Sequence, residues 1–475
     1  MHARKITIEP VTRIEGHARV TIHLNPEGGV EQTFFHVDEF RGLEKFSEGR
    51  PYFEMPQITQ RICGICPVSH HLASVKACDA ILGAEPPRPA RLLRELMHMA
   101  QFVQSHGMHF FHLAAPDLLL GFDAAPTERN VFGIVRANPQ LALKAVHLRR
   151  FGQQIIEILG GKRVHPNFAI PGGVNAPLAL KDRDAIAGER DRHLAFAREA
   201  VDLIKQWLEG HDELARSFAA FPSGYMGLVD AQGGLQLYDG YVRILDDRGD
   251  LLTQFAPSAY LENIAEHVEP WSFLKFPYYR KQGWPQGAYR VGPLGRLNTI
   301  DKTGTPLADG EMAAFRQLAG GKPVEGSLFY HYARMIELLF ALEIMGCLLE
   351  DPDILSTDIR ASGSQRLNPG GIGIIEAPRG TLIHDYKVDE NGLLSHVNLI
   401  VATGHNNWAM NQAVAAVAKA YINGGRPTEG ILNRVEASIR CYDPCLSCST
   451  HAIGRMPLQV VVKGTDGTIL RHMAR

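Results

Sequence analysis

Cys63-Gly64-Ile65-Cys66 and Cys445-Leu446-Ser447-Cys448 are two C-x-x-C sequences near opposite ends of a chain of 475 residues. Each C-x-x-C places two sulfurs on one turn of backbone, close enough to bind a single metal ion. The pairs can supply four thiolates to one centre only if the whole domain folds to bring its ends together. The sequence therefore predicts one domain organised around a shared sulfur site.

Each pair taken alone is compatible with several kinds of site. A C-x-x-C can be half of a zinc site, a redox dithiol or part of an iron–sulfur cradle. Structural zinc sites usually draw their ligands from one compact module. Cysteine pairs at opposite ends of a long chain do not fit that pattern well. A thioredoxin-like dithiol requires a strand-to-helix junction, and neither pair has that context. A four-cysteine iron–sulfur cluster remains open.

The composition is ordinary for a globular protein, and a net charge of -2 gives no reason to expect nucleic acid or an anionic membrane as partner. No apolar run reaches the ~18 residues of a membrane span, and the first residues read as a strand rather than a signal peptide. Seven cysteines predict a reducing compartment, so we expect a cytoplasmic location. Of the three outside the pairs, Cys78 and Cys347 are expected to be plain buried residues, and the spacing of Cys441 does not predict a ligand.

Apolar patterns predict a mainly α fold with peripheral β-sheets, an α+β class with a central bundle of long helices. Residues 5–40 read as strands, with a turn at 25–29. A helical pattern over 56–83 breaks at 63–67, which places the first pair in a loop between two helices. Apolar residues at helical spacing predict further helices at 92–115, 138–160, 181–218, 327–350 (strongly amphipathic), 408–421 and 429–440.

The central stretch 221–321 is richer in Gly, Pro and aromatic residues and contains a predicted hairpin at 238–252. It is either a subdomain or an insertion packed on the helices. Residues 370–403 are predicted to be β again, with Asn391-Gly392 as a hairpin turn. The resulting division is a domain at 1–451, with a β region at 1–40, a helical core at 56–220 and 327–350 and the β/loop-rich insertion at 221–321, followed by an extension at 452–475.

Polar residues near the pairs supply what a four-thiolate site needs. Such a site is soft and strongly anionic, so it requires cationic or hydrogen-bonding support and a group that moves protons. Arg61, His70 and Arg379 are candidates for the support, and Glu15 and Glu44 for the proton transfer. Taken singly, each is an ordinary residue: a surface or salt-bridging arginine, a satisfied helix histidine or a carboxylate at a strand end.

The cysteine pairs, with Glu44 and Arg61, fall into two longer motifs. Arg41-Gly-Leu-Glu44, followed by Gln60-Arg-Ile-Cys63-Gly-Ile-Cys66, resembles the N-terminal signature of nickel–iron hydrogenase large subunits. Tyr442-Asp-Pro-Cys445-Leu-Ser-Cys448-Ser-Thr-His451 resembles their C-terminal signature. PVTRIEGH, HLAAPD, EAPRG and VATGH extend the resemblance along most of the chain. The sequences CGICPVSHH and YDPCLSCSTH are most similar to those of the cytoplasmic, bidirectional, NAD-linked branch of the family.

The resemblance implies a nickel ion and an iron that carries carbonyl and cyanide ligands, held by the four cysteines. Cys63 and Cys445 would bind nickel terminally, and Cys66 and Cys448 would bridge the two metals. The implied reaction is reversible heterolytic cleavage of H2, with a thiolate as base.

The resemblance also assigns roles around the metals. Glu15 would be the first proton relay beyond Cys445, because partial burial raises the pKa of a carboxyl group toward neutral pH. Arg379 would face the diatomic ligands. Glu44 and His451 would hold a structural magnesium ion. The other residues assigned to the surroundings of the metals are His70 (at a bridging sulfur), Thr403 (at cyanide), Asp117 and Asp443.

The resemblance makes residues 452–475 a maturation tail. Members of the family are made as precursors and cut just after the residue corresponding to His451 by a dedicated endopeptidase, once insertion factors have supplied nickel and iron. The tail itself reads as a hairpin with a turn at 464–467. The alternative is a permanent C-terminal strand.

Electrons must leave through another polypeptide, because only three cysteines remain outside the pairs. We expect a heteromultimer that contains an iron–sulfur small subunit together with diaphorase subunits that carry flavin and contact NAD. No G-x-G-x-x-G sequence follows a strand here, so the nicotinamide site is not expected on this chain.

Three alternatives stay open. The first is an F420- or sulfur-linked hydrogenase large subunit. The second is a non-catalytic relative, the quinone-site subunit of respiratory complex I, which shares the fold but lacks the cysteine pairs. The third is a structural zinc or iron–sulfur protein. Retention of the four cysteines, Glu15 and Arg379 speaks against the second.

Overall fold

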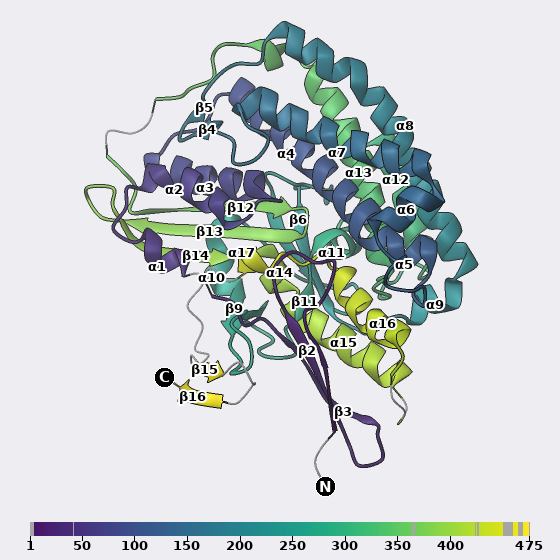
Figure 1. The fold of residues 1–475 in the computed structure, drawn as a ribbon. Helices are drawn as coiled ribbons and strands as arrows, with labels where there is room; N and C mark the ends of the chain where they lie inside the picture. The colour runs from purple at the N-terminus through teal and green to yellow at the C-terminus, as the bar shows by residue number, and fades with distance from the viewer. Residues whose placement is uncertain are drawn as a thin grey trace.

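The computed structural model describes residues 4–40, 42–362, 366–422, 424, 427–449, 459–463 and 469–474. Long helices fill one side of the molecule, and small sheets lie beside and below them (Figure 1). The predicted α+β class with a central helix bundle is confirmed. In the part of the chain that the structure describes, no helix is both long and apolar enough to cross a membrane.

Four long helices form the bundle: α4 (Arg88–Met108), α7 (Pro139–Gly160), α8 (Leu180–Gly210) and α13 (Phe329–Glu350). α4 packs against α7 and α13, and α13 also packs against α8. Gly152 allows the close approach of α7 to α4, because a Cβ there would meet the carbonyl oxygen of Ala100 at 2.6 Å.

Three expectations for the bundle are wrong in detail. α13 is buried on almost all sides rather than amphipathic, because neighbours cover it on every face. Cys347, near its end, is exposed rather than buried. The helix predicted over 181–218 is broken at His211, so α8 ends at Gly210 and α9 (Asp212–Ser217) follows.

The N-terminal strands form an antiparallel sheet in the order β1 (Arg4–Ile8), β2 (Arg19–Leu24), β3 (Val30–His36), within the range predicted as β. Inward-facing apolar residues set the register, for example Ile6 opposite Ile22. The turn after β2 closes through the Asn25 side chain, which accepts a hydrogen bond from the backbone N–H of Gly29.

The first cysteine pair lies between a 3-10 turn (Gln60–Ile62) and α3 (Pro67–Leu82), as the break in the helical pattern predicted. α3 packs on the antiparallel sheet β12 (Gly370–Ala377), β13 (Gly380–Val388), β14 (Leu394–Ile400). Two glycines of β12 make this contact close. A Cβ at Gly371 or Gly373 would meet a carbonyl oxygen of α3 at 2.0 Å.

Residues 221–321 contain a four-stranded sheet in the order β11 (Tyr289–Arg290), β6 (Gly224–Val229), β7 (Tyr241–Leu245), β8 (Leu251–Phe255). The β7–β8 pair is the predicted hairpin. The stretch also holds two helices that were not predicted, α11 (Gly292–Thr299) and α12 (Pro306–Gln317). A second apolar core joins this sheet to β12–β14 through Ile374, Ile383 and Ile400.

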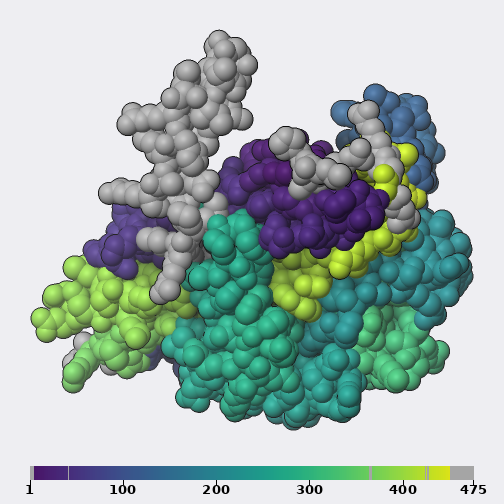
Figure 2. Space-filling view, turned by 90° about the horizontal axis from the view of Figure 1, so that it is seen from below, coloured from purple at the N-terminus to yellow at the C-terminus, as the bar shows by residue number. Residues whose placement is uncertain are grey.

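The C-terminal part returns to the first strands. α15 (Asn407–Tyr421) packs on β3, and α16 (Glu429–Arg440) packs on α15. Figure 2 shows the purple N-terminal strands lying over the yellow-green C-terminal helices. β15 (Gln459–Lys463) and β16 (Ile469–Ala474) pair antiparallel, as predicted for the tail.

The remaining elements are short: α1 (Leu43–Ser47), a 3-10 turn (Tyr52–Glu54), α2 (Met55–Thr59), a π-helix (His109–Ala114), α5 (Ala115–Leu120), α6 (Val131–Ala137), β4 (Ala169–Ile170), β5 (Gly173–Val174), a 3-10 turn (Pro257–Ala259), α10 (Tyr260–Asn263), β9 (Ile264–His267), β10 (Phe276–Tyr279), a 3-10 turn (Pro352–Leu355), α14 (Ala402–His405) and α17 (Leu446–Ser449).

Candidate metal centre

Four cysteine sulfurs converge at one buried point. One ligand atom from each of Cys63, Cys66, Cys445 and Cys448 lies within 4.8 Å of the other three. The Sγ atoms are 3.2 Å apart for Cys63 and Cys445 and 3.3 Å apart for Cys66 and Cys448. All four are buried free thiols. Both C-x-x-C pairs thus face one centre, which is the arrangement expected for a shared metal site.

The thiols influence one another's ionisation. Hydrogen bonds from the neighbouring thiols lower the pKa of Cys63 well below its usual value. Burial raises the pKa of Cys445 and of Cys448. Thiols bind a metal ion as thiolates, so metal binding here releases protons and is favoured as pH rises.

Glu15 touches the centre from the N-terminal side. Its carboxylate Oε2 lies 3.1 Å from Sγ of Cys445 and accepts a hydrogen bond from the backbone N–H of Ser447 at 3.0 Å. The backbone carbonyl of Glu15 accepts from the N–H of Leu446. Glu15 is half-buried, so it lies between the sulfur and the molecular surface. Its position is suited to carrying a proton to or from Cys445.

A clamp of charged residues holds Glu15 in this place. The carboxylate of Glu436, on α16, accepts from both the backbone N–H and the hydroxyl of Thr12, and Arg440 donates to the Thr12 carbonyl. Arg13 donates to Asp117 at 2.5 Å, and Arg440 pairs with the other oxygen of the same carboxylate. Asp117 therefore joins the segment before Glu15 to the helix that precedes the second cysteine pair.

Asp117, which the resemblance assigned to the surroundings of the metals, is held by arginines rather than by the sulfurs. Its ion-pair partners among the described residues are Arg13, Arg440 and Arg129. Burial opposes ionisation of Asp117, but the guanidinium groups of Arg440 and Arg13 hold its pKa below its usual value. Arg13 and Arg440 connect it to the segment that carries Glu15 rather than to the sulfurs themselves.

Arg379 and Asp443 form a buried ion pair beside the sulfurs. Nε of Arg379 donates to the backbone carbonyl of Asp443 at 2.6 Å, and one Nη donates to its carboxylate at 3.0 Å. Burial raises the pKa of Asp443 to about 6, although Arg379 opposes the shift. Asp443 has a φ of 51°, in the left-handed region, so this ion pair holds a strained turn two residues before Cys445.

A small buried cavity of about 10 Å³ lies against three of the sulfurs, enough for about one water molecule. Nη1 of Arg379, which also lines it, has no hydrogen-bond partner among the described residues. Thr403 accepts a hydrogen bond from the N–H of Cys445, which leaves its own hydroxyl hydrogen for another acceptor. A bound metal with small ligands would satisfy these donors. The lining is Cys66, Ser69, His70, Ala377, Arg379, Leu382, Val401, Ala402, Thr403, Cys445 and Cys448.

Two other predicted residues flank the first cysteine pair. Nε2 of His70 lies 3.4 Å from Sγ of Cys448. Arg61 is exposed, close to His165, whose ring nitrogen lies 3.3 Å from the backbone carbonyl of Cys63. Cys63 therefore lies directly beneath the surface on this side.

Glu44 lies away from the sulfurs, where its carboxylate accepts a hydrogen bond from the N–H of Leu399 at 2.8 Å. Burial raises its pKa. His451, its expected partner in a magnesium site, and the expected cleavage point lie outside the described residues. The structure therefore leaves that pair untested.

Sequence reasoning missed several residues of the site. Arg13, Glu436 and Arg440 make the clamp. Arg13 lies in the PVTRIEGH motif beside Glu15, which was the signal that could have revealed it, whereas Glu436 and Arg440 lie on a helix without such a motif. His384 and Tyr386, at the far side of His70, alternate along β13 as buried polar residues. Polar side chains on the inward face of a strand were the signal that could have revealed them.

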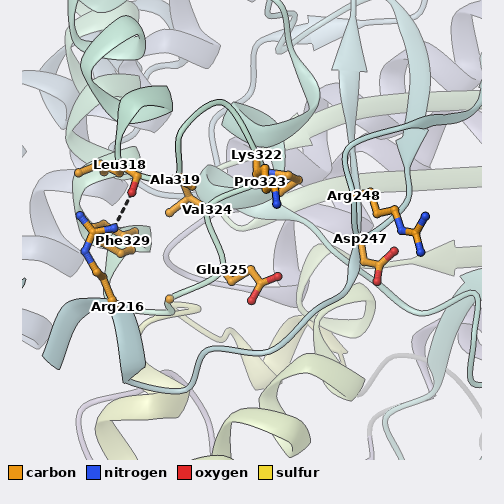
Figure 3. Close-up of a pocket in the computed structure, with 11 residues that line it drawn as sticks. Arg216, Asp247, Arg248, Leu318, Ala319, Lys322, Pro323, Val324, Glu325 and Phe329 are labelled. Carbon is orange, nitrogen blue, oxygen red and sulfur yellow. Dashed lines mark hydrogen bonds between the residues drawn. The ribbon is translucent and has the colours of Figure 1, made fainter. Parts of the chain in front are cut away.

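A wider cavity of about 560 Å³ lies elsewhere, on the surface (Figure 3). Arg216 and Phe329 form one side of it, and Asp247 and Arg248, from the turn between β7 and β8, form the other. No cysteine or histidine of the described chain lines it, so it offers no set of metal ligands of the kind found at the sulfurs.

Comparison with known proteins agrees with the geometry. The sequence pattern of the nickel-dependent hydrogenase family matches residues 41–130 and 238–451. The chain belongs to the nickel-dependent hydrogenases. Residues 5–40 of this hydrogenase chain match a second pattern, described as HoxL-like. The four cysteines, Arg379 and Glu44 fall within the first match, and Glu15 within the second.

The hydrogenase chain is 42% identical to the beta subunit of the NAD-reducing hydrogenase HoxS of Cupriavidus necator, over 100% of both chains. It is 44% identical to one chain of the F420-non-reducing hydrogenase of Methanothermobacter thermautotrophicus, over 99% of the present sequence and 100% of that relative. A crystal structure of an NAD+-reducing NiFe hydrogenase matches with a TM-score of 0.92 and 44% identity, over 95% of this chain and 100% of that chain. These findings confirm the resemblance seen in the sequence.

Proposed function

We propose that this chain is the catalytic subunit of a hydrogenase that cleaves H2 reversibly and passes the electrons to NAD(P) through partner subunits. The observation that carries the proposal is the buried cluster of four thiols, with the Glu15 carboxylate against Cys445 and Arg379 beside the adjoining cavity. H2 is small, so a buried cavity of this size suits it better than the wide surface cavity.

The four sulfurs fit a nickel–iron centre. Cys63, Cys66, Cys445 and Cys448 would together hold nickel and an iron with carbonyl and cyanide ligands. When bound, the metals would polarise H2 and take up its electron pair. The unpartnered Nη1 of Arg379 and the Thr403 hydroxyl would hydrogen-bond the small ligands.

Glu15 would move the proton. A thiolate at Cys445 would accept a proton from H2 and pass it across 3.1 Å to the Glu15 carboxylate. The N–H of Ser447 holds that carboxylate in line with the sulfur. The surface lies on the far side of Glu15, which is half-buried, so the next transfer is outward.

Electrons would leave near Cys63. Gly64 is exposed, and a Cβ there would meet nothing within 4 Å, so a partner can approach the backbone directly above Cys63. The other thiols form no second cluster in the described part of the chain. An iron–sulfur small subunit docked over Gly64, Arg61 and His165 would bring its cluster closest to the metals, and diaphorase subunits with flavin would complete the path to NAD.

Three further assignments remain proposals. Glu44 and His451 would hold magnesium. Residues 452–475 would be removed after His451 by a maturation endopeptidase, after insertion factors load the metals. The chain would be located in the cytoplasm, because all seven of its cysteines are free thiols, as expected in a reducing compartment.

The test is to purify the complete complex, measure nickel and iron per catalytic chain, and assay H2-dependent reduction of NAD+, coenzyme F420 and polysulfide in parallel. We expect about one nickel and one iron and reduction of NAD+. If nickel and iron are present but only F420 or only polysulfide is reduced, that compound would replace NAD+ as the proposed electron acceptor. Zinc alone, with no H2 cleavage, would overturn the proposal.

A further inference from the structure

Arg379 is carried by a turn that does not hold its own shape. Pro378 and Arg379 are the loop residues between β12 and β13, and the pair that closes the hairpin is Ala377 and Gly380. Two-residue loops that match the twist of the strands need a positive φ at the first loop residue, which the ring of Pro378 forbids. Arg379 has no positive φ either. Contacts from outside the hairpin must therefore fix this turn.

Arg296, on α11, supplies such contacts. Its Nη1 donates to the backbone carbonyl of Ala377 at 2.9 Å, and its Nη2 donates to that of Pro378 at 3.2 Å. These are the two carbonyl groups directly before Arg379. One guanidinium thus holds the backbone that leads into the residue facing the cavity. Ala377 itself also lines that cavity.

Two carboxylates hold the guanidinium of Arg296 in this place. Nε and Nη2 donate to the two oxygens of Glu337, on α13, at 2.6 and 2.7 Å, and Nη1 donates to Glu376, on β12, at 2.6 Å. All five N–H groups of Arg296 therefore have an acceptor. The three side chains are 0% exposed. Burial opposes the charge of Arg296, but Glu337 and Glu376 hold its pKa above the usual value, so it remains a cation.

Gly292, one helical turn before Arg296, also contacts the turn. A Cβ at Gly292 would lie 2.8 Å from the backbone carbonyl oxygen of Arg379. A Cβ at Gly380 would lie 2.2 Å from Cγ2 of Val291 and 3.0 Å from the backbone N of Gly292. The turn therefore lies against the start of α11 with no room for another carbon atom.

We propose that Arg296 and Gly292 are positioning residues for Arg379, because they fix its turn so that the unpartnered Nη1 of Arg379 faces the cavity beside the sulfurs. This inference rests on the proposed function, because it takes Arg379 to hydrogen-bond small ligands of the metals. Among the described residues, the hydrogen bonds of the Arg296 side chain go to Glu337, Glu376 and the turn, and none goes to a cysteine. Arg296 thus acts on the centre through Arg379.

A merely structural role would have different consequences. Breaking a buried ion pair lowers the stability of a protein wherever the pair lies. A positioning role predicts an effect that disappears once Arg379 itself has been replaced. The infrared stretching bands of carbonyl and cyanide give a second readout, because they shift when a hydrogen-bond donor moves relative to these ligands.

The first experiment introduces R296K into the complete complex. This variant keeps a positive charge between Glu337 and Glu376, but one ammonium group cannot reach both carboxylates and both carbonyl groups. We expect it to retain nickel and iron, to shift the carbonyl and cyanide bands, and to lower kcat for H2 cleavage about tenfold to a hundredfold. In the R379K background the same substitution should change kcat by less than about twofold.

The matched control is R94K. Arg94, on α4, is also buried and donates to one carboxylate, that of Asp79, and to the backbone carbonyls of Ile170 and Gly173. Neither Arg94 nor these partners line the cavity at the sulfurs. R94K should therefore lower stability, as R296K does, but leave the infrared bands and kcat at their wild-type values.

G292A tests the same contact surface and keeps the test decisive if R296K does not assemble. The added Cβ presses on the carbonyl oxygen of Arg379, so G292A should shift the same bands and have no further effect on kcat in the R379K background. G304A is its control. Gly292 and Gly304 have φ values of +81° and +90°, but a Cβ at Gly304 would meet no atom within 4 Å.

The outcomes separate the two proposals. A wild-type complex that binds no nickel or fails to cleave H2 would reject the proposed function and this role with it. An active wild type in which R296K and G292A have the same infrared bands as R94K and G304A would reject the positioning role alone. An equal loss of kcat for R296K with and without R379K would also reject it, as would loss of nickel from both R296K and G292A.

Discussion

Gly16 offers a sharp test of how the two ends of the chain meet. It follows Glu15 directly and has a φ of +84°, and a Cβ at this position would lie 2.7 Å from Cβ of Leu446 and 3.1 Å from the backbone N of Ser447. Gly16→Ala therefore pushes apart the two segments that place Glu15 against Cys445. Gly49→Ala is the matched control, because Gly49 has a φ of +81° but no atom within 4 Å of an added Cβ.

The magnitude follows from two separate costs. A left-handed backbone costs an alanine roughly 1–2 kcal/mol, and both variants carry this cost. Only Gly16→Ala adds the overlap with Leu446, which at the level of an overpacked core is about 1–3 kcal/mol. We therefore expect a loss of unfolding free energy of about 1–2 kcal/mol for Gly49→Ala and about 2–5 kcal/mol for Gly16→Ala.

The assay combines urea unfolding with metal analysis and H2-dependent dye reduction. Gly16→Ala should lose a larger fraction of its activity than of its nickel, because the overlap displaces the Glu15 carboxylate more than it disturbs the sulfurs. Gly49→Ala should keep both. Equal stability and equal activity in the two variants would refute the contact between Gly16 and Leu446 and the placement of Glu15 that depends on it.

Four other outcomes are expected. Glu15→Gln should keep nickel and iron but slow H2 cleavage about 10²- to 10⁴-fold, because an amide cannot carry the proton; an H2/D+ exchange rate equal to wild type would contradict this. Arg379→Lys keeps the charge but loses the fork of donors, so H2 cleavage should fall about 10²-fold or more with nickel retained; unchanged kcat would argue against a role at the small ligands. Burial raises the pKa of Glu95 to about 7 from 4.5, so its stabilising contribution is fully present below pH 4.5 and is lost as pH rises through 7. Glu95→Gln should therefore raise unfolding free energy at pH 8, by up to about 3 kcal/mol, and not at pH 4; equal urea midpoints at pH 8 would contradict the raised pKa. Intact mass of the active complex should show a chain that ends at His451, and a full-length mass at full activity would count against cleavage.

Local patterns in the sequence were enough to predict much of the fold. Strands at 5–40, the break before Pro67 and the hairpin at Asn391 all follow from alternation, helical spacing or turn residues that act over a few positions. α11 and α12 were missed because Gly and Pro dominate their surroundings, although Pro293 and Pro306 mark their first turns in a typical way.

The site was predictable only where a motif marked it. The cysteines and Glu15 could be named in advance, since they belong to long signatures. The partners of Asp117 could not, because Arg13 and Arg440 lie 104 and 323 residues away and meet it only through tertiary packing. The π-helix, from which the Leu113 carbonyl accepts a hydrogen bond from Arg13, has no sequence signal that a single chain reveals.

The wide separation of the two cysteine pairs has a consequence for how the protein is made. Each sulfur that meets another across the centre is 382 residues from it. A ribosome that adds about 5–20 residues per second produces the second pair about 20–80 s after the first. During that interval Cys63 and Cys66 exist without their partners and are open to oxidants and to unsuitable metals. Metal can therefore be enclosed only after synthesis is almost complete, and the timing of translation itself delays assembly of the centre.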